Sequence, residues 1–366
     1  MNLKLNNSIP SKPPNPTQLN PKPIIVVGGI NQDMVVRVAE LPLPGETVFG
    51  DSLLLRTGGK GANQAVAATA LGGHRGRVYL VGKVGDDNTG HQIVGQLAKR
   101  GVNTSMIAVE PGKSTGIAMI LVNRNGENII AVAQGANSEV GSDQIDTAAD
   151  ILSETGGVAV IQFELPIETA VAATQRFCDM DGVTTLINPS PVPSIPLEQL
   201  KGADVLVVNE VEAEEITGIG HHIESHSQAL DVARQIAAHG IGIVIITLGQ
   251  LGAIMYSSTN SSSQRNGSTG EYSIAARPPT VKVVDTTGAG DAFMGGLAAG
   301  ISKGWTIEES FGFAIRAGAV ATTKMGAQEA LPDVVDANDF TNHLPLVIFN
   351  PATESSTTLN EVHVNV

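Results

Sequence analysis

Residues 285–293 read Asp285-Thr286-Thr287-Gly288-Ala289-Gly290-Asp291-Ala292-Phe293. This glycine-rich stretch predicts a turn that leads into a helix, with backbone N–H groups open to a closely approaching ligand. The first N–H groups of a helix lack intrahelical partners, and the helix dipole adds partial positive charge there. The stretch therefore predicts an anion hole for a transferring phosphoryl group, formed by Gly288, Ala289 and Gly290. Asp291 lies at its mouth, where a general base would take a proton from an attacking hydroxyl.

A second glycine-rich stretch lies far upstream and fits the same chemistry. It reads Gly58-Gly59-Lys60-Gly61-Ala62-Asn63-Gln64. It is not a Walker A sequence, because the GxxxxGK[ST] spacing is missing, and no GxGxxG follows the first strand. Taken alone, it could be an ordinary helix N-terminus. The polar side chains around these glycines could hydrogen-bond a polyhydroxylated ligand. They are Asn31, Asp33, Lys60 and Asn63.

Composition limits the class of protein. The chain has 366 residues, of which 42% are hydrophobic, 41 are glycine and only 3% are aromatic, as is usual for α/β architecture. A net charge of −14 argues against a nucleic-acid partner, which needs a basic surface, but permits a nucleotide site. Cys178 is the single cysteine, so no intrachain disulfide is possible and a reducing compartment such as the cytoplasm is expected. No apolar run approaches the ~20 residues of a membrane span, so no membrane partner is expected.

Short apolar runs alternate with helical segments along most of the chain. This alternation predicts an α/β fold: a doubly wound, mainly parallel sheet with helices on both faces. Ligands bind such sheets beyond the carboxyl ends of the strands. The predicted strands are 24–29, 78–81, 158–163, 184–188, 205–209 and 242–247, and the predicted helices include 61–71, 88–100, 168–177 and 229–239.

Two stretches, 33–56 and 115–132, break this alternation. Both are rich in branched residues with no helix between their strands, so they predict a small β-sheet lid inserted into the α/β core. The main domain is predicted to span residues 23–345. Residues 1–22, rich in Pro and Asn, predict a disordered tail, with an organelle transit peptide as the alternative. Residues 346–366 predict a C-terminal tail, and 257–268 a long hairpin loop.

The chain resembles the PfkB-type carbohydrate kinases, and among them the ribokinases. The resemblance covers roughly 24–332. Gly58–Gln64 resembles the N-terminal signature of the family, and Asp285–Phe293 matches its C-terminal signature. Further motifs fall between them in the family's order: Pro44-Gly45-Glu46-Thr47, Gly85-Asp86-Asp87, Asn209-Glu210-Val211-Glu212-Ala213-Glu214 and Thr247-Leu248-Gly249. The ribokinase-like features are GGINQD at 28–33, GGKGAN at 58–63 and KMGAQ at 324–328.

The resemblance implies ATP-dependent phosphorylation of D-ribose at its 5-hydroxyl, which gives ribose 5-phosphate and ADP. It implies that Asp291 is the base and that Gly288, Ala289 and Gly290 form the anion hole. The sugar-binding positions it implies are Asn31, Asp33, Gly59, Lys60, Gly61, Ala62, Asn63 and Glu164. The implied ATP-binding positions are Asn209, Thr247, Leu248, Gly249, Gly252, Gly290 and Ile315.

The resemblance also implies two metal ions. Mg²⁺ would bind with ATP, and Glu212 would order water on it. K⁺ is implied as an activator, held mostly by backbone carbonyls at Asp285, Thr287, Ala321, Lys324, Gly326 and Ala330. Two positions depart from the family pattern: Ile315 stands where a stacking His or Asn is frequent, and Ala330 where serine is common. A homodimer formed through the lid is expected, because an open sheet has edges to protect.

Three other functions remain open on the sequence. The first is a related kinase acting on 2-deoxyribose, fructose or adenosine, because the residues that shape the pocket do not give its volume. The second is a non-catalytic sugar-binding regulator, which the intact Asp291, Gly288 and Gly290 disfavour. The third is a nicotinamide dehydrogenase, which the missing dinucleotide fingerprint disfavours.

Overall fold

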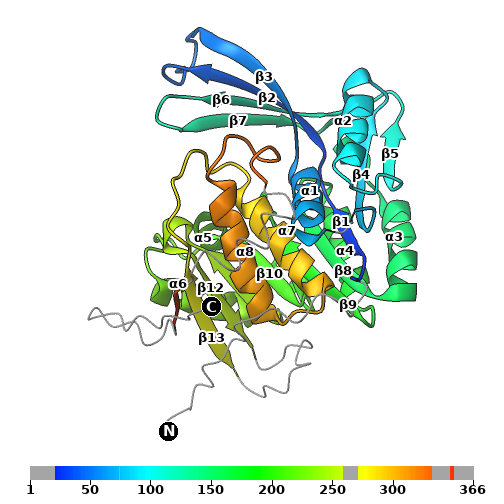
Figure 1. Cartoon of the computed structure of the whole chain (residues 1–366), viewed down its shortest axis with the longest axis vertical. Helices are drawn as coiled ribbons and strands as arrows, with labels where there is room; N and C mark the ends of the chain where they lie inside the picture. The colour runs from blue at the N-terminus through cyan, green and yellow to red at the C-terminus, as the bar shows by residue number, and fades with distance from the viewer. Residues whose placement is uncertain (1–20, 74, 259–270, 332–346, 350–366) are drawn as a thin grey trace.

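A computed structural model describes residues 21–73, 75–258, 271–331 and 347–349. Its large sheet has the strand order β14-β13-β12-β11-β10-β9-β8-β1-β4-β5 (Figure 1). The strands from β11 to β5 are parallel, whereas β12, β13 and β14 continue the sheet antiparallel. Their bounds are β1 Ile24–Val27, β4 Val78–Gly85, β5 Ile107–Glu110, β8 Gly157–Gln162, β9 Val183–Asn188, β10 Val205–Asn209, β11 Ile243–Thr247, β12 Ala253–Ser257, β13 Tyr272–Arg277 and β14 Val347–Phe349.

Helices cover both faces of this sheet. Successive strand residues belong to opposite cores: Ile25 and Val27 pack in one hydrophobic cluster, and Ile24 and Val26 in the other. The first cluster takes in α3 to α6 and the second α1, α2, α7 and α8. The helices are α1 Lys60–Gly72, α2 Asn88–Lys99, α3 Ser142–Thr155, α4 Ile167–Cys178, α5 Glu210–Thr217, α6 His226–Ala237, α7 Ala289–Ser302 and α8 Ile307–Ala321, with short 3₁₀ turns at Gly135–Glu139, Leu197–Leu200 and Gly249–Leu251. The predicted fold class is confirmed.

A small separate sheet, called the lid sheet here, lies at the top of the molecule in Figure 1. Its strand order is β3-β2-β6-β7, formed by β2 Asn31–Val38, β3 Gly50–Gly58, β6 Gly116–Val122 and β7 Asn128–Ala133. These strands correspond to the two helix-free stretches of the sequence. The lid sheet is joined to the α/β core by two short connections that contain glycine. One runs from the end of β1 through Gly28 and Gly29 to β2, and the other runs from β3 through Gly59 into α1.

The predicted tail at 346–366 differs from the structure at its start. Val347–Phe349 forms β14, which pairs antiparallel with β13 and extends the large sheet. A three-residue strand gives no periodic signal in sequence, and backbone pairing to an existing edge places it. The predicted N-terminal tail lies almost entirely outside the described residues, as does most of the 257–268 loop. Among the described residues, no helix is long and apolar enough to cross a membrane.

Candidate active site

The two glycine-rich stretches meet at Asp291. Asn63 Nδ2 donates to Oδ2 of Asp291 across 2.9 Å, and Gln64 Nε2 donates to Oδ1 across 3.1 Å. Asn63 lies in the first turn of α1 and Gln64 directly after it, and Asp291 lies in the first turn of α7. Both carboxylate oxygens of the predicted base therefore accept side-chain amide hydrogen bonds. Such bonds fix the carboxylate orientation and favour its ionised form.

The start of α7 has the geometry that its glycines predict. Gly288 is the N-cap with φ of +76°, and a Cβ there would lie 2.7 Å from Cα of Ala327, so only glycine fits without strain. A Cβ on Gly290 would meet nothing within 4 Å, so this residue borders open space. Ala289 differs from its predicted role in the anion hole, because its N–H donates to the carbonyl of Thr286 across 3.2 Å. The N-terminal N–H groups that remain for an anion are those around Gly290.

Three carboxyl groups surround the site, from Asp33, Glu164 and Asp291. Burial, with the charges of Glu164 and Asp291, raises the pKa of Asp33 from 3.8 to about 7, although Arg56 opposes the shift. Burial also raises the pKa of Glu164, against a backbone hydrogen bond from Lys60 and the charge of Lys60. Burial raises the pKa of Asp291 as well, against the charge of Lys60 and the hydrogen bonds of its two amide partners. Such a cluster of shifted pKa values is typical of a functional site.

Glu164 and the turn before α1 are locked together. The N–H of Lys60 donates to Oε2 of Glu164 across 2.7 Å. Gly59 caps α1 with φ of +88°, and a Cβ on it would lie 2.6 Å from the carbonyl oxygen of Gly29. The end of β1 and the start of α1 thus approach more closely than any side chain allows. Asn31 begins β2 beside them and is 2% exposed, with its Oδ1 accepting from Asn137 Nδ2 across 2.8 Å.

A cavity of about 190 Å³ opens next to Asp291. It lies at the carboxyl ends of β9, β10 and β11, where Asn188, Asn209 and Thr247 are the last strand residues. This is the edge at which doubly wound sheets bind ligands. The predicted site residues that line it are Lys60, Asn209, Glu212, Thr247, Gly288, Gly290 and Asp291. The cavity thus joins the predicted base and anion hole to part of the predicted nucleotide site.

Glu212 and Asn209 form a reciprocal cap at the start of α5. The N–H of Asn209 donates to Oε2 of Glu212 across 3.0 Å, and the N–H of Glu212 donates to Oδ1 of Asn209 across 2.7 Å. One oxygen of Glu212 is thereby committed to the backbone. Among the described residues, no cluster of three or more His, Cys, Asp or Glu could hold a metal ion.

The predicted cation loop is drawn together by Asp285. Its Oδ2 accepts from the N–H of Gly326 across 2.8 Å, and its Oδ1 accepts from the N–H and hydroxyl of Thr287 across 3.0 and 2.7 Å. Burial favours the neutral acid, but these hydrogen bonds outweigh it and lower the pKa of Asp285. Ala321 and Ala330 are both fully buried beside this loop, whereas the side chain of Lys324 is exposed.

Several predicted site residues have packing roles in the structure. Ile315 is 5% exposed and belongs to the core cluster that includes α7 and α8. Ala62 is fully buried, and a Cβ on Gly61 would lie 2.5 Å from the carbonyl carbon of Gly28. Leu248 is 5% exposed in the turn after β11, where its N–H donates to the carbonyl of Gly252 across 2.7 Å. Gly249 lies exposed in the same turn.

Three amides outside the predicted set of catalytic and ligand-binding residues support the site. Gln64 holds Asp291 directly, Asn137 holds Asn31 and the backbone of Ile30, and Gln328 donates to Asn63. Gln64 and Gln328 each lie within a glycine-rich motif quoted above, GGKGANQ and KMGAQ. Position in the motif was therefore the signal that could have found them.

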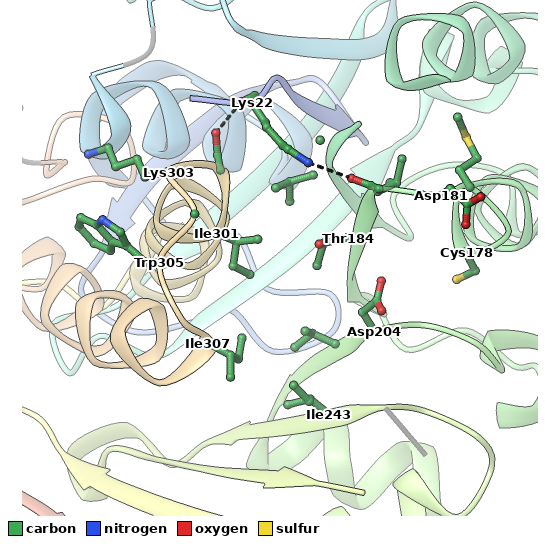
Figure 2. Close-up of a pocket in the computed structure, with 18 of the residues that line it drawn as sticks. Lys22, Cys178, Asp181, Thr184, Asp204, Ile243, Ile301, Lys303, Trp305 and Ile307 are labelled. Carbon is green, nitrogen blue, oxygen red and sulfur yellow. Dashed lines mark hydrogen bonds between the residues drawn. The ribbon is translucent and has the colours of Figure 1, made fainter. Parts of the chain in front are cut away.

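A larger cavity, of about 500 Å³, lies away from these residues (Figure 2). It is lined by the first residues of β8 to β11 and by the C-terminal end of α7, so it opens at the opposite edge of the sheet from Asp291. Ile301, Ile307 and Ile243 surround it, and Lys22 extends across it to donate to the carbonyl of Gly182 at 3.4 Å. None of the predicted site residues lines this cavity, so its size does not make it the active site.

A family model described as pfkB family carbohydrate kinase matches residues 22–334. The chain belongs to the pfkB family of carbohydrate kinases. It is 34% identical over 319 residues to the ribokinase of Schizosaccharomyces pombe, with 86% of this chain and 96% of the relative covered. It is 31% identical over 318 residues to the deoxyribokinase of Salmonella typhi, with 87% and 98% covered. This pfkB family member is therefore an enzyme, a sugar kinase.

A solved structure supports the fold of this pfkB kinase. Arabidopsis thaliana ribokinase complexed with ribose and ATP matches with a TM-score of 0.74 at 27% identity. The match covers 88% of this chain and 99% of that chain. The match therefore leaves no large part of the solved chain without a counterpart in this chain.

Proposed function

We propose that this kinase transfers the terminal phosphoryl group of ATP to the 5-hydroxyl of D-ribose, giving ribose 5-phosphate and ADP. The observation that carries the proposal is the placement of Asp291. Asp291 lies in the first turn of α7, beside the open N-terminal backbone at Gly290, and its carboxylate accepts hydrogen bonds from two side-chain amides of α1. A base next to an anion-binding helix start is what hydroxyl-to-phosphoryl transfer requires.

Sugar recognition is assigned to polar groups of the lid sheet and of the core next to it. Carboxylates accept hydrogen bonds from hydroxyl groups, and amide N–H groups donate to them, so a mixed set can read the hydroxyl pattern of a sugar. Asp33, Glu164 and Asn63 supply such a set beside Asp291. A bound sugar would displace water from these carboxyls, and the lid sheet, to which Asp33 belongs, would restrict its return.

The proposed reaction combines one proton transfer with one phosphoryl transfer. Asp291 accepts the proton of the 5-hydroxyl, the sugar oxygen forms a bond to the terminal phosphorus of ATP, and the bond from that phosphorus to the bridging oxygen of ADP breaks. Negative charge on the transferring group faces the N-terminus of α7. The ammonium of Lys60, which lines the same cavity, adds positive charge.

The nucleotide is assigned to the remaining walls of the cavity, at Asn209 and Thr247, and to the adjoining turn that contains Gly249 and Gly252. Mg²⁺ fits this site only as an ion that arrives with the nucleotide, because the described residues of the cavity offer it Glu212 beside the proposed base Asp291 rather than a cage of three or more ligands. When bound, it would neutralise phosphate charge, and Glu212 would hold its water.

The loop around Asp285 suits a monovalent cation. The ionised carboxylate of Asp285 joins residues 287 and 326, so their neighbouring carbonyls are brought near one negative charge. Oxygen atoms from backbone carbonyls are suitable ligands for a hard cation. We therefore assign K⁺ activation to the loop formed by Asp285, Thr287, Ala321, Lys324, Gly326 and Ala330.

A homodimer through the lid sheet is the proposed assembly. Strand register puts Leu55, Met34 and Met119 in one row, and Leu53, Val36, Leu121 and Ile129 in the next, all on the face opposite Asp33. Four of these side chains are about half exposed: Leu53 52%, Leu55 59%, Met119 56% and Ile129 48%. A contiguous apolar face of this kind suits an isologous contact with a second copy.

Turnover of ATP to ADP with Mg²⁺ tests the proposed function. The acceptors are ribose, 2-deoxyribose, fructose and adenosine, each with and without K⁺. The proposal expects the highest kcat/KM with ribose and a higher rate with K⁺. 2-Deoxyribose is the second candidate, because a deoxyribokinase is nearly as similar to this chain as the ribokinase. Preference for another acceptor would reassign the pocket, and absence of turnover with all four would contradict the proposal.

A further inference from the structure

Gln328, a buried residue that follows the end of α8, is linked by hydrogen bonds to the proposed base Asp291 through Asn63. Gln328 Nε2 donates to Oδ1 of Asn63 across 3.0 Å, and Asn63 Nδ2 donates to Oδ2 of Asp291 across 2.9 Å. Gln328 is 3% exposed and Asn63 is 8% exposed, so water competes little for either bond. These two bonds form a chain from Gln328 to the carboxylate.

The direction of these hydrogen bonds matters because a side-chain amide has an acceptor oxygen on one side and a donor NH₂ group on the other. An asparagine side chain turned by 180° presents its oxygen where its nitrogen had been, with almost the same shape. In that orientation Oδ1 of Asn63 would face a carboxylate oxygen of Asp291, and both are acceptors. A donor that engages Oδ1 of Asn63 from the other side prevents this turn. Gln328 supplies that donor.

The backbone at Gln328 and at the two residues before it is also held in place. The backbone carbonyl oxygen of Gln328 accepts a hydrogen bond from Nη1 of Arg100, at the end of α2, across 3.0 Å. The preceding residue, Ala327, packs directly on Gly288, and Gly326 donates its N–H to Asp285. The position of the Gln328 amide is therefore set by the same loop that packs against the start of α7.

We propose that Gln328 is a positioning residue that acts through Asn63 to orient the base Asp291. It touches neither reactant, and it keeps the N–H group of Asn63, rather than its oxygen, directed at the carboxylate. The inference rests on the proposed role of Asp291 in phosphoryl transfer and deepens it. It also restricts Asn63 to one function toward a sugar hydroxyl, that of a hydrogen-bond donor.

A double-mutant cycle tests whether Gln328 acts through Asn63. Gln328→Met keeps the volume and removes the donor, and we expect kcat to fall about tenfold, as one lost neutral hydrogen bond implies, with the KM for ATP unchanged. In an Asn63→Ala background, the same change should have no further effect on kcat. Equal losses in both backgrounds would overturn the inference. Gln199→Met, an exposed glutamine far along the chain, is the matched control.

Gln328→Glu gives a second readout that a merely structural role would not move. The protonated carboxylic acid can donate to Oδ1 of Asn63 as the amide does, whereas the ionised carboxylate cannot. The ratio of kcat for Gln328→Glu to kcat for the wild type should therefore rise as the pH falls. The corresponding ratio for Gln328→Met should stay flat. Parallel profiles for the two variants would contradict the inference.

The amide resonances of Asn63 separate this inference from the proposed function. In ¹⁵N-labelled protein without substrate, Gln328→Met should shift the side-chain NH₂ signals of Asn63, and Gln199→Met should not. Unmoved signals overturn the inference even when the wild type is an active kinase. Moved signals in a wild type that turns over no acceptor would instead contradict the proposed function alone.

Discussion

Asn63 and Asp291, which lie 228 positions apart in the sequence, are joined by a hydrogen bond of 2.9 Å. The bond connects the first turns of α1 and α7, so the geometry of the base depends on how these two helices pack. They pack closely: a Cβ on Gly295 of α7 would lie 2.4 Å from Cβ of Ala67 in α1. Small residues at the helix contact thus bring the two glycine-rich stretches into one site.

Replacement of Asp291 by asparagine should remove the general base with little change in shape. We expect kcat to fall at least ~10²-fold, the lower end of the effect of general-base catalysis, while binding of the sugar is retained. ATP-to-ADP turnover at saturating sugar measures the loss, and ligand-induced thermal stabilisation measures binding. Asp150→Asn, at an exposed position of α3, is the control. A kcat close to that of the wild type would remove Asp291 from the mechanism.

Lys60→Met should move the pH profile. Burial raises the pKa of Asp291, and the charge of Lys60 opposes this. Without that charge the pKa of Asp291 rises further, so the base becomes protonated at a higher pH. The acid limb of kcat/KM should shift to higher pH, and the KM for the sugar should rise. Lys99→Met, at the exposed end of α2, should leave the profile in place, and an unmoved limb in Lys60→Met would contradict the assignment.

Asp33 should make the stability of the sugar-free protein depend on pH. Its pKa is about 7 in the fold against 3.8 for the ordinary carboxyl, so the fold holds this proton more tightly than the unfolded chain does. The stabilisation is complete below about pH 4 and is lost as the pH rises to about 7. At ~1.4 kcal/mol per pH unit, about 2–3 kcal/mol is lost between pH 5 and pH 7.

Asp33→Asn removes this proton-dependent contribution. The free energy of unfolding in urea should therefore favour the variant over the wild type more at pH 8 than at pH 5. Asp51→Asn, at an exposed position of β3, should change the free energy of unfolding equally at both pH values. An equal difference at both pH values for Asp33→Asn would show that Asp33 is ionised throughout.

The sequence predicted the elements better than it predicted the contacts between their side chains. Apolar runs such as Ile24–Val27 and Val205–Asn209 identify buried strands because their composition leaves few alternatives. The glycine motifs identified both loops of the site. The motifs contain Asn63, Gln64 and Gln328, but the hydrogen bonds that these amides make could not be predicted, because the direction of an amide depends on neighbours that only folding brings together. The same holds for Ala289, whose N–H is engaged by a turn carbonyl.

A charge on the outer face of the lid sheet should weaken the proposed dimer. Met119 is 56% exposed at the centre of this face, in register with Met34 and Leu55. Met119→Lys would place two like charges in an isologous contact, so we expect the dimer Kd to rise at least ~10-fold, with the fold retained. Analytical ultracentrifugation at micromolar concentrations measures it. Asn125→Lys, in the exposed turn between β6 and β7, adds the same charge away from the apolar rows and should leave the Kd unchanged. Equal weakening by both variants would assign the effect to net charge, and a monomeric wild type would contradict the dimer.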